Sequence, residues 1–259
     1  QISLLKNIIG VIGFIGFLAV QGNVFPSFTH HEIWILIISG ILGVAVGDLL
    51  FLASLRRLGA GLNAIVSTAY SPTIFLLAFF MFGEVISLQA YFGGVLVIAG
   101  IIIGTLEIPK NRSRENIAWG VLYGFTAQAL TAFSVLLLKP IMEIHPVVPI
   151  ALVRFSTGAV LSIGFLVFAK GLTSLRETIK QGFKHPPLIM GSILGTFLSV
   201  IFWLAGYKYT LAGRAAIYNQ LATIFIILMA AVFLKEAMTR RKWLAVCCAL
   251  SGVLLVSAY

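Results

Sequence analysis

Residues 58–104 read LGAGLNAIVSTAYSPTIFLLAFFMFGEVISLQAYFGGVLVIAGIIIG, and their pattern returns later in the chain. A shift of 152 positions carries Ala60-Gly61 onto Ala212-Gly213, Glu84 onto Glu236, and Gly100 onto Gly252. Both copies contain a small-residue turn, an apolar span, a Glu beside polar neighbours, and a second apolar span ending near a Gly. In an apolar chain, such a repeat is typical of a transporter built from two related halves.

The composition indicates an all-α integral membrane protein. The chain is 60% hydrophobic and 10% charged, and its apolar runs reach the roughly 20 residues that a helix needs to cross a bilayer. Runs of this length are helices, because every backbone polar group in lipid must be satisfied within the segment. We predict nine transmembrane helices, at about 4–24, 33–55, 60–82, 87–106, 117–138, 147–169, 187–207, 213–234 and 241–258.

A second match shows how the halves correspond. A shift of 148 positions carries Leu4 onto Leu152 and Lys6 onto Arg154. In the second half, a complete span at 117–138 precedes this segment, and its counterpart would lie before Gln1. We therefore expect a ten-helix (5+5) inverted-repeat architecture lacking its first helix here. Its parts are a first repeat of four helices at 1–106, a linker at 107–116, and a second repeat of five helices at 117–259.

The distribution of charge predicts orientation. The net charge is +10, but most Lys and Arg fall in alternate loops, and the positive-inside rule places those loops and the linker in the cytoplasm. This loop pattern argues against nucleic-acid binding. Glycines four residues apart predict close helix packing; the pairs include Gly100 with Gly104, Gly120 with Gly124, and Gly191 with Gly195.

Two symmetry-related helices carry polar side chains at similar depth. In the span 60–82, Tyr70 and Ser71 precede Pro72, which frees a backbone carbonyl one turn earlier and predicts a local break. Tyr218, Asn219 and Gln220 occupy the related stretch of the second half, and Tyr123 and Gln128 lie in the span 117–138. These residues are candidate substrate contacts. The alternative is polar contact between helices without a substrate.

Three ionisable residues lie inside apolar spans. Asp48 marks either a pathway, as a coupling site or charge site, or a pair with a Lys or Arg of a neighbouring helix. Arg154 is either an interface anchor or a contact for an anion, and Lys6 is its counterpart in the first half. His30-His31 beside Glu32 favour a polar connector, because no further ligand lies near them in sequence. We therefore predict no metal site and no cofactor.

These motifs resemble the EamA family of the drug/metabolite transporter superfamily over nearly the whole chain. The similarity lies in Ala60-Gly61-Leu62-Asn63-Ala64, Ser71-Pro72, Gly83-Glu84, the run from Gly93 to Gly100, and the second-half stretches Ala212–Ala216 and Ser251–Leu254. The resemblance implies a two-fold pseudosymmetric carrier that moves small metabolites by alternating access, often outward. Two departures are Asp48, where the family usually has an uncharged residue, and Lys235, which replaces a Gly before Glu236. Glu84 and Glu236, at helix ends, are predicted to be structural caps.

The functional prediction is a secondary active transporter, an exporter of a small polar metabolite such as an amino acid, coupled to a proton or to exchange. One alternative is efflux of lipophilic cations or drugs using Asp48. Another is a membrane-embedded scaffold or lipid-modifying enzyme, although paired catalytic groups for an enzyme are not evident in the sequence. The expected partners are a small-molecule substrate and the lipid bilayer. We expect a multi-pass protein of the cell membrane, as a monomer or homodimer.

Overall fold

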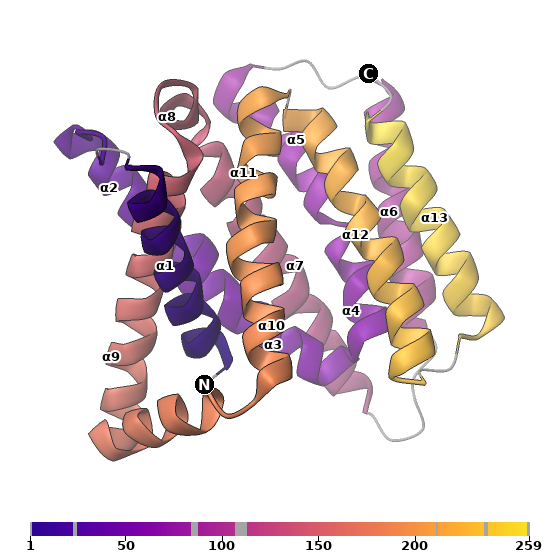
Figure 1. Ribbon diagram of the computed structural model, residues 1–259. Coiled ribbons are helices and arrows are strands. Elements are labelled where there is room, and N and C mark those ends of the chain that lie inside the picture. The colour runs from indigo at the N-terminus through magenta and orange to yellow at the C-terminus, as the bar shows by residue number, and fades with distance from the viewer. Residues whose placement is uncertain are drawn as a thin grey trace. The chain divides into compact units, whose positions relative to one another are not determined.

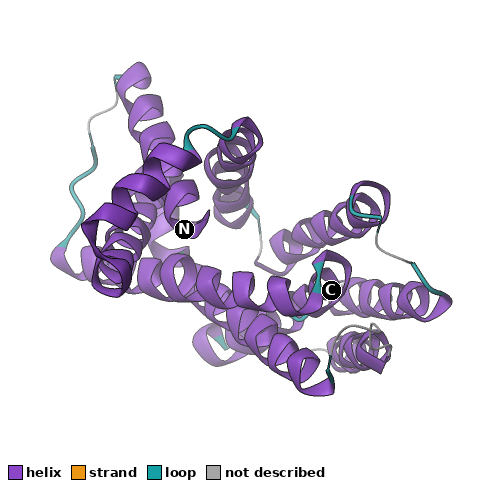
Figure 2. Ribbon diagram, turned by 90° about the horizontal axis from the view of Figure 1, so that it is seen from below, coloured by secondary structure: helices purple, strands orange, loops and turns teal. Residues whose placement is uncertain are grey.

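The computed structural model describes residues 2–22, 25–83, 88–106, 113–210, 212–235 and 238–257. Every regular element within these ranges is helical, as Figure 2 shows. Within the same ranges, six continuous helical stretches are long and apolar enough to cross a membrane, some of them made of successive elements, and Phe92–Ile103 is a shorter apolar part of the helix Leu88–Leu106. The protein is therefore an all-α, multi-pass membrane protein, as the hydropathy of the sequence predicts.

The helices form two compact units. Unit 1 comprises Gln1–Asp48 and Leu137–Tyr209, and unit 2 comprises Leu49–Leu136 and Thr210–Tyr259. Each unit takes helices from both halves of the sequence, so its core is formed by contacts between residues far apart in the chain.

In unit 1, α1 lies against α9, and Figure 1 shows the two side by side. The π-helical segment η1 packs on the same helix, while η2 packs on α1. The Phe14 ring lies in the core of unit 1. Its centroid is 5.5 Å from the ring centroid of Phe155 and 5.4 Å from that of Phe197. The elements of this unit are α1 (Ile2–Gln21), α2 (His30–Ser39), η1 (Gly40–Gly47), α8 (Lys139–Ile144), α9 (Val147–Gly182), α10 (Pro186–Ser192), η2 (Ile193–Leu198) and α11 (Ser199–Tyr209).

In unit 2, α6 and α13 pack along one another (Figure 1). A Cβ added at Gly100 would come within 2.7 Å of the Ala245 carbonyl, and one at Gly252 within 2.5 Å of the Gly93 carbonyl. Only glycine permits backbones to approach this closely. The elements of this unit are α3 (Asp48–Leu58, from Leu49 onward), α4 (Ala60–Ser67), α5 (Tyr70–Phe82), α6 (Leu88–Leu106), α7 (Arg114–Leu136), α12 (Ala212–Phe233) and α13 (Arg240–Ser257).

The prediction of close helix packing at paired glycines is confirmed for some pairs but not for all of them. Gly120 packs on Leu58, and Gly124 packs on Ser54, where an added Cβ would lie 2.7 Å from the hydroxyl oxygen. At Gly191 and Gly195, no described atom comes within 4 Å of an added Cβ. That last pair therefore makes no close contact with the described residues, because the spacing of two glycines does not specify which face of a helix is covered.

The predicted break near Pro72 is confirmed. The span 60–82 divides into α4 and α5 at Thr68-Ala69, where the amides of both residues bond three residues back, to Ile65 and Val66. Pro72 cannot donate to the carbonyl of Thr68, so the helix tightens there. In the second half, α12 runs unbroken from Ala212 to Phe233. The break is therefore a property of the first half.

A feature that the sequence did not predict occurs in both halves. The helix that begins at His30 widens into the π-helix η1 at Gly40–Gly47, just before Asp48, and the helix that begins at Pro186 widens into η2 at Ile193–Leu198. A shift of 152 positions superimposes the two segments in sequence. π-helices are rare and are frequently found at functional sites. The residues that contact η1 and η2 are therefore candidates for a functional site.

Candidate functional site

The charged centre of unit 1 contains an ion pair between Lys6 on α1 and Asp48 at the end of η1. The ammonium of Lys6 donates to Asp48 Oδ2, and the two side chains are 24% and 25% exposed. This pair is the alternative that the sequence left open for Asp48, a partner on a neighbouring helix. Two charges within apolar spans are stabilised when they meet, because each supplies the counter-ion that lipid does not.

Arg154 lies beside this pair on α9. Its side chain is 2% exposed, interacts electrostatically with Asp48, and places the guanidinium carbon 5.7 Å from the centre of the Trp203 ring. Arg154 is therefore a charge held inside the protein rather than one extended into its surroundings. Its role as an interface anchor or as a contact for an anion stays a prediction.

Close backbone contact brings α9 and η1 together around these charges. A Cβ at Gly40 would lie 2.8 Å from the Arg154 carbonyl, and one at Gly158 would lie 2.4 Å from Val44 Cγ1. The glycines thus hold η1 against the face of α9 that carries Arg154. With all three groups ionised, Lys6, Asp48 and Arg154 carry one net positive charge.

Asn7 adds a buried amide next to Lys6. Its side chain is 0% exposed, and its Nδ2 would lie 3.2 Å from a Cβ at Gly158. Within the described ranges, neither amide atom has a hydrogen-bond partner. Sequence reasoning did not select Asn7, because an Asn among polar and apolar neighbours at the start of a helix carries no distinctive pattern.

The candidate residues of unit 2 lie around the break in the span 60–82. Tyr70 and Ser71 are buried at the start of α5, and the Ser71 hydroxyl lies 3.4 Å from the Ala216 carbonyl on α12. Gln128 on α7 donates to the Ser67 hydroxyl at 3.0 Å. These contacts connect helices to one another, as the alternative of polar interhelical contact requires.

Tyr123 has a charged neighbour in unit 2. Its ring centre lies 5.4 Å from the guanidinium carbon of Arg57 and 5.7 Å from the centre of Trp119. Arg57 also donates to the Asn116 side chain at 2.6 Å. Tyr123 therefore lies at the basic end of α3. Asn219 is half-buried on α12. The side chains of Tyr218 and Gln220 lie outside the described residues, as do Glu84 and Glu236, so their predicted roles stay predictions.

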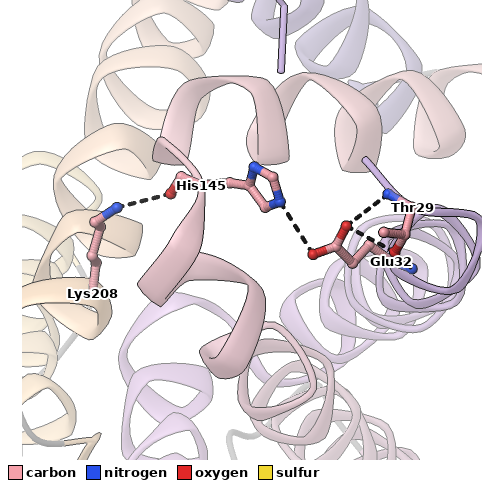
Figure 3. Close-up of polar contacts among 4 residues, drawn as sticks. All are labelled: Thr29, Glu32, His145 and Lys208. Atoms are coloured by element: carbon pink, nitrogen blue, oxygen red, sulfur yellow. Dashed lines mark hydrogen bonds and ion pairs between the residues drawn. The ribbon is translucent and has the colours of Figure 1, made fainter. Parts of the chain in front are cut away.

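A polar cluster that the sequence did not reveal ties together three elements of unit 1 (Figure 3). Glu32 accepts hydrogen bonds from the backbone N–H and hydroxyl of Thr29, at 2.7 and 2.9 Å, and lies 3.1 Å from His145 Nε2. Lys208 donates to the His145 carbonyl at 2.8 Å. Glu32 and His145 are 113 residues apart in sequence, so no local pattern connects them.

In the part of the chain that the structure describes, no group of three or more His, Cys, Asp or Glu is arranged to hold a metal ion. His30 and His31 are exposed at the start of α2, and Cys247 and Cys248 are free thiols on α13.

Comparison with known proteins agrees with this architecture. The sequence profile of the EamA-like transporter family matches residues 1–106 and 118–258. An uncharacterized transporter of Archaeoglobus fulgidus is 25% identical over 209 residues, which cover 80% of this chain and 69% of that protein. One solved crystal structure has a similar fold, with a TM-score of 0.69 at 14% identity, and the match covers 99% of this chain and 86% of that one.

Proposed function

Because the chain belongs to the EamA-like transporter family, we propose that it is a secondary active exporter of a small polar metabolite that bears a carboxylate, such as an amino acid. It works by alternating access, coupled to a proton or to exchange, in the cell membrane, as a monomer or homodimer. Its partners are this substrate and the bilayer, with no role for nucleic acid. A membrane transporter needs a polar site within apolar helices, and the charges of unit 1 supply one.

The observation that carries the substrate class is the grouping of Lys6, Asp48 and Arg154. Two cations and one carboxylate leave a net positive charge, which favours an anionic group and opposes a lipophilic cation. Asp48 is already engaged by Lys6, so the negative charge on which efflux of lipophilic cations would depend is neutralised.

A zwitterionic amino acid matches all three groups. Its carboxylate would pair with Arg154 or Lys6, and its amine would pair with Asp48, so that substrate binding exchanges one set of ion pairs for another. Such an exchange keeps every buried charge compensated throughout binding. A substrate with a carboxylate but no amine would instead leave the Lys6–Asp48 pair intact and contact Arg154.

The experiment is transport by the purified, full-length protein in proteoliposomes, measured with radiolabelled amino acids, simple carboxylates and quaternary amines. We expect uptake or exchange of a carboxylate class, lost in Arg154→Gln and retained in Arg176→Gln. Arg176 is the matched control, because it lies on the same helix beyond the kink at Gly171. Transport of quaternary amines alone, abolished in Asp48→Asn, would overturn the proposal in favour of drug efflux.

A further inference from the structure

One histidine connects three elements at the outer end of unit 1. This outer end is defined by Thr29, Glu32, His145 and Lys208, and the charge distribution of the loops predicts that it faces away from the cytoplasm. The ring of His145 reaches Glu32 on α2, while its main-chain carbonyl accepts from Lys208 on α11. Figure 3 shows Glu32 and Lys208 on opposite sides of His145.

The two oxygens of Glu32 have separate roles. Oε2 accepts from Thr29 and completes the capping box that starts α2, while Oε1 faces Nε2 of His145 at 3.1 Å. Capping of the helix needs only the first of these contacts. The second contact joins α2 to the turn between α8 and α9, and so it is a tertiary bond rather than a local one.

The surroundings of the contact make its strength depend on charge. The side chains of His145 and Glu32 are 13% and 15% exposed, and the Phe28 ring lies 4.6 Å from the imidazole centre. A carboxylate can only accept a hydrogen bond, so Nε2 must carry the hydrogen when His145 is neutral as well as when it is charged. The carboxylate alone already assists this hydrogen bond. In the charged form of His145 the contact also becomes an ion pair, which adds the Coulomb attraction between two opposite charges.

We propose that the Glu32–His145 contact is a latch that holds the outer end of unit 1 closed, and that protonation of His145 tightens it. Histidine changes charge between about pH 5 and 8, so the latch responds to the proton concentration on its own side of the membrane. The inference rests on the alternating access proposed above, because a latch needs an open state, but it does not depend on which substrate is carried.

Other titratable groups lie on the elements that surround the latch. Glu32 is preceded on α2 by His30 and His31, both exposed. Lys139 and Glu143 lie on α8, and Lys208 on α11 contacts the carbonyl of His145 rather than its ring. Protonation of the imidazole therefore acts first on Glu32, which is the group in contact with it.

The test measures the distance across the latch in the absence of any substrate. Spin labels replace Ile33 on α2 and Ile144 on α8, which are both exposed and uncharged, in a full-length protein with Cys247→Ala and Cys248→Ala. Double electron–electron resonance in lipid nanodiscs then gives the ratio of closed to open populations. Between pH 8 and pH 5 we expect that ratio to rise about fivefold, which corresponds to the attraction within a partly exposed ion pair.

Two variants and one control decide the outcome. In His145→Gln, which keeps a donor but cannot become charged, and in Glu32→Gln, the ratio should not change with pH. His185→Gln is the matched control, because this exposed histidine lies before α10 in the same unit and should leave the response intact. A ratio independent of pH in the parent protein, or a response that persists in His145→Gln, would overturn the latch. Neither result affects the transport test, so the two proposals fail separately.

Discussion

The ammonium of Lys6 pairs with the carboxylate of Asp48, although 42 residues separate them in sequence. The two residues lie on neighbouring elements of unit 1, α1 and the end of η1. Each is unfavourable alone in an apolar environment, so their pairing couples the position of α1 to that of η1. This coupling makes the pair open to a double-mutant test.

Asp48→Asn should lower stability, because it leaves the Lys6 ammonium without its counter-ion. We expect a loss of about 2 kcal/mol, less than the roughly 3–5 kcal/mol for a fully buried pair, since both side chains are partly exposed. Thermal unfolding in detergent, followed by circular dichroism, measures the loss. Lys6→Met combined with Asp48→Asn should recover most of it. If the two single losses simply add in the double variant, the pair does not couple the helices.

Gly158→Ala should destabilise unit 1, because the new Cβ would lie 2.4 Å from Val44 Cγ1 and 3.2 Å from Asn7 Nδ2. Overpacking of this kind costs about 1–3 kcal/mol. Gly164→Ala is the matched control on the same helix, since no described atom lies within 4 Å of its Cβ. There the gain in helix propensity should slightly raise the unfolding temperature. Equal effects of the two substitutions would show that α9 and η1 are not in close contact at Gly158.

Local features of the fold could be predicted from the sequence because they depend on neighbouring residues. The span 60–82 and its break near Pro72 follow from hydropathy and from the missing N–H of proline. The correspondence of Lys6 with Arg154 follows from the repeat, and the structure pairs Lys6 with Asp48. That pair is one of the two alternatives that the sequence offers for Asp48, whereas the roles of these charges in transport stay predictions.

The remaining features depend on how helices pack, which hydropathy does not encode. His145 reaches Glu32 across 113 residues, and that contact exists only once the turn between α8 and α9 meets the start of α2. The π-helical segments η1 and η2 have no composition that distinguishes them from ordinary apolar helix. Asn7 became notable only through its burial. Each of these required three-dimensional contacts.

Asn7→Leu should raise the stability of unit 1. The amide is fully buried, and both of its polar atoms lack a hydrogen-bond partner within the described part of the chain, so the folded state bears their desolvation cost. Leu has the same branched shape as Asn, with methyl groups in place of the amide oxygen and nitrogen, so the replacement should gain about 1 kcal/mol after allowance for the bulkier methyl groups. The measurement is the unfolding temperature in detergent, with Asn7→Asp as a contrast that should lower it. A loss of stability in Asn7→Leu would contradict the burial of an unsatisfied amide.

Trp203 should report on anion binding at Arg154. The guanidinium carbon of Arg154 lies 5.7 Å from the centre of the Trp203 ring, and a carboxylate that pairs with the guanidinium changes the electric field at the indole. A protein in which Trp34, Trp119 and Trp243 are replaced by Phe should therefore shift its fluorescence emission when titrated with the transported carboxylate. The shift should vanish in Arg154→Gln.

The matched control for this titration keeps Trp119 as the sole tryptophan. Trp119 lies on α7 in unit 2, next to Tyr123, and its emission should not follow occupancy of Arg154. The midpoint of the Trp203 titration should equal the concentration that half-saturates transport, because both quantities report the same bound carboxylate. A shift that survives Arg154→Gln, or one of equal size in the Trp119 protein, would mean that the anion binds elsewhere, and Arg154 would then be a structural charge compensated by Asp48.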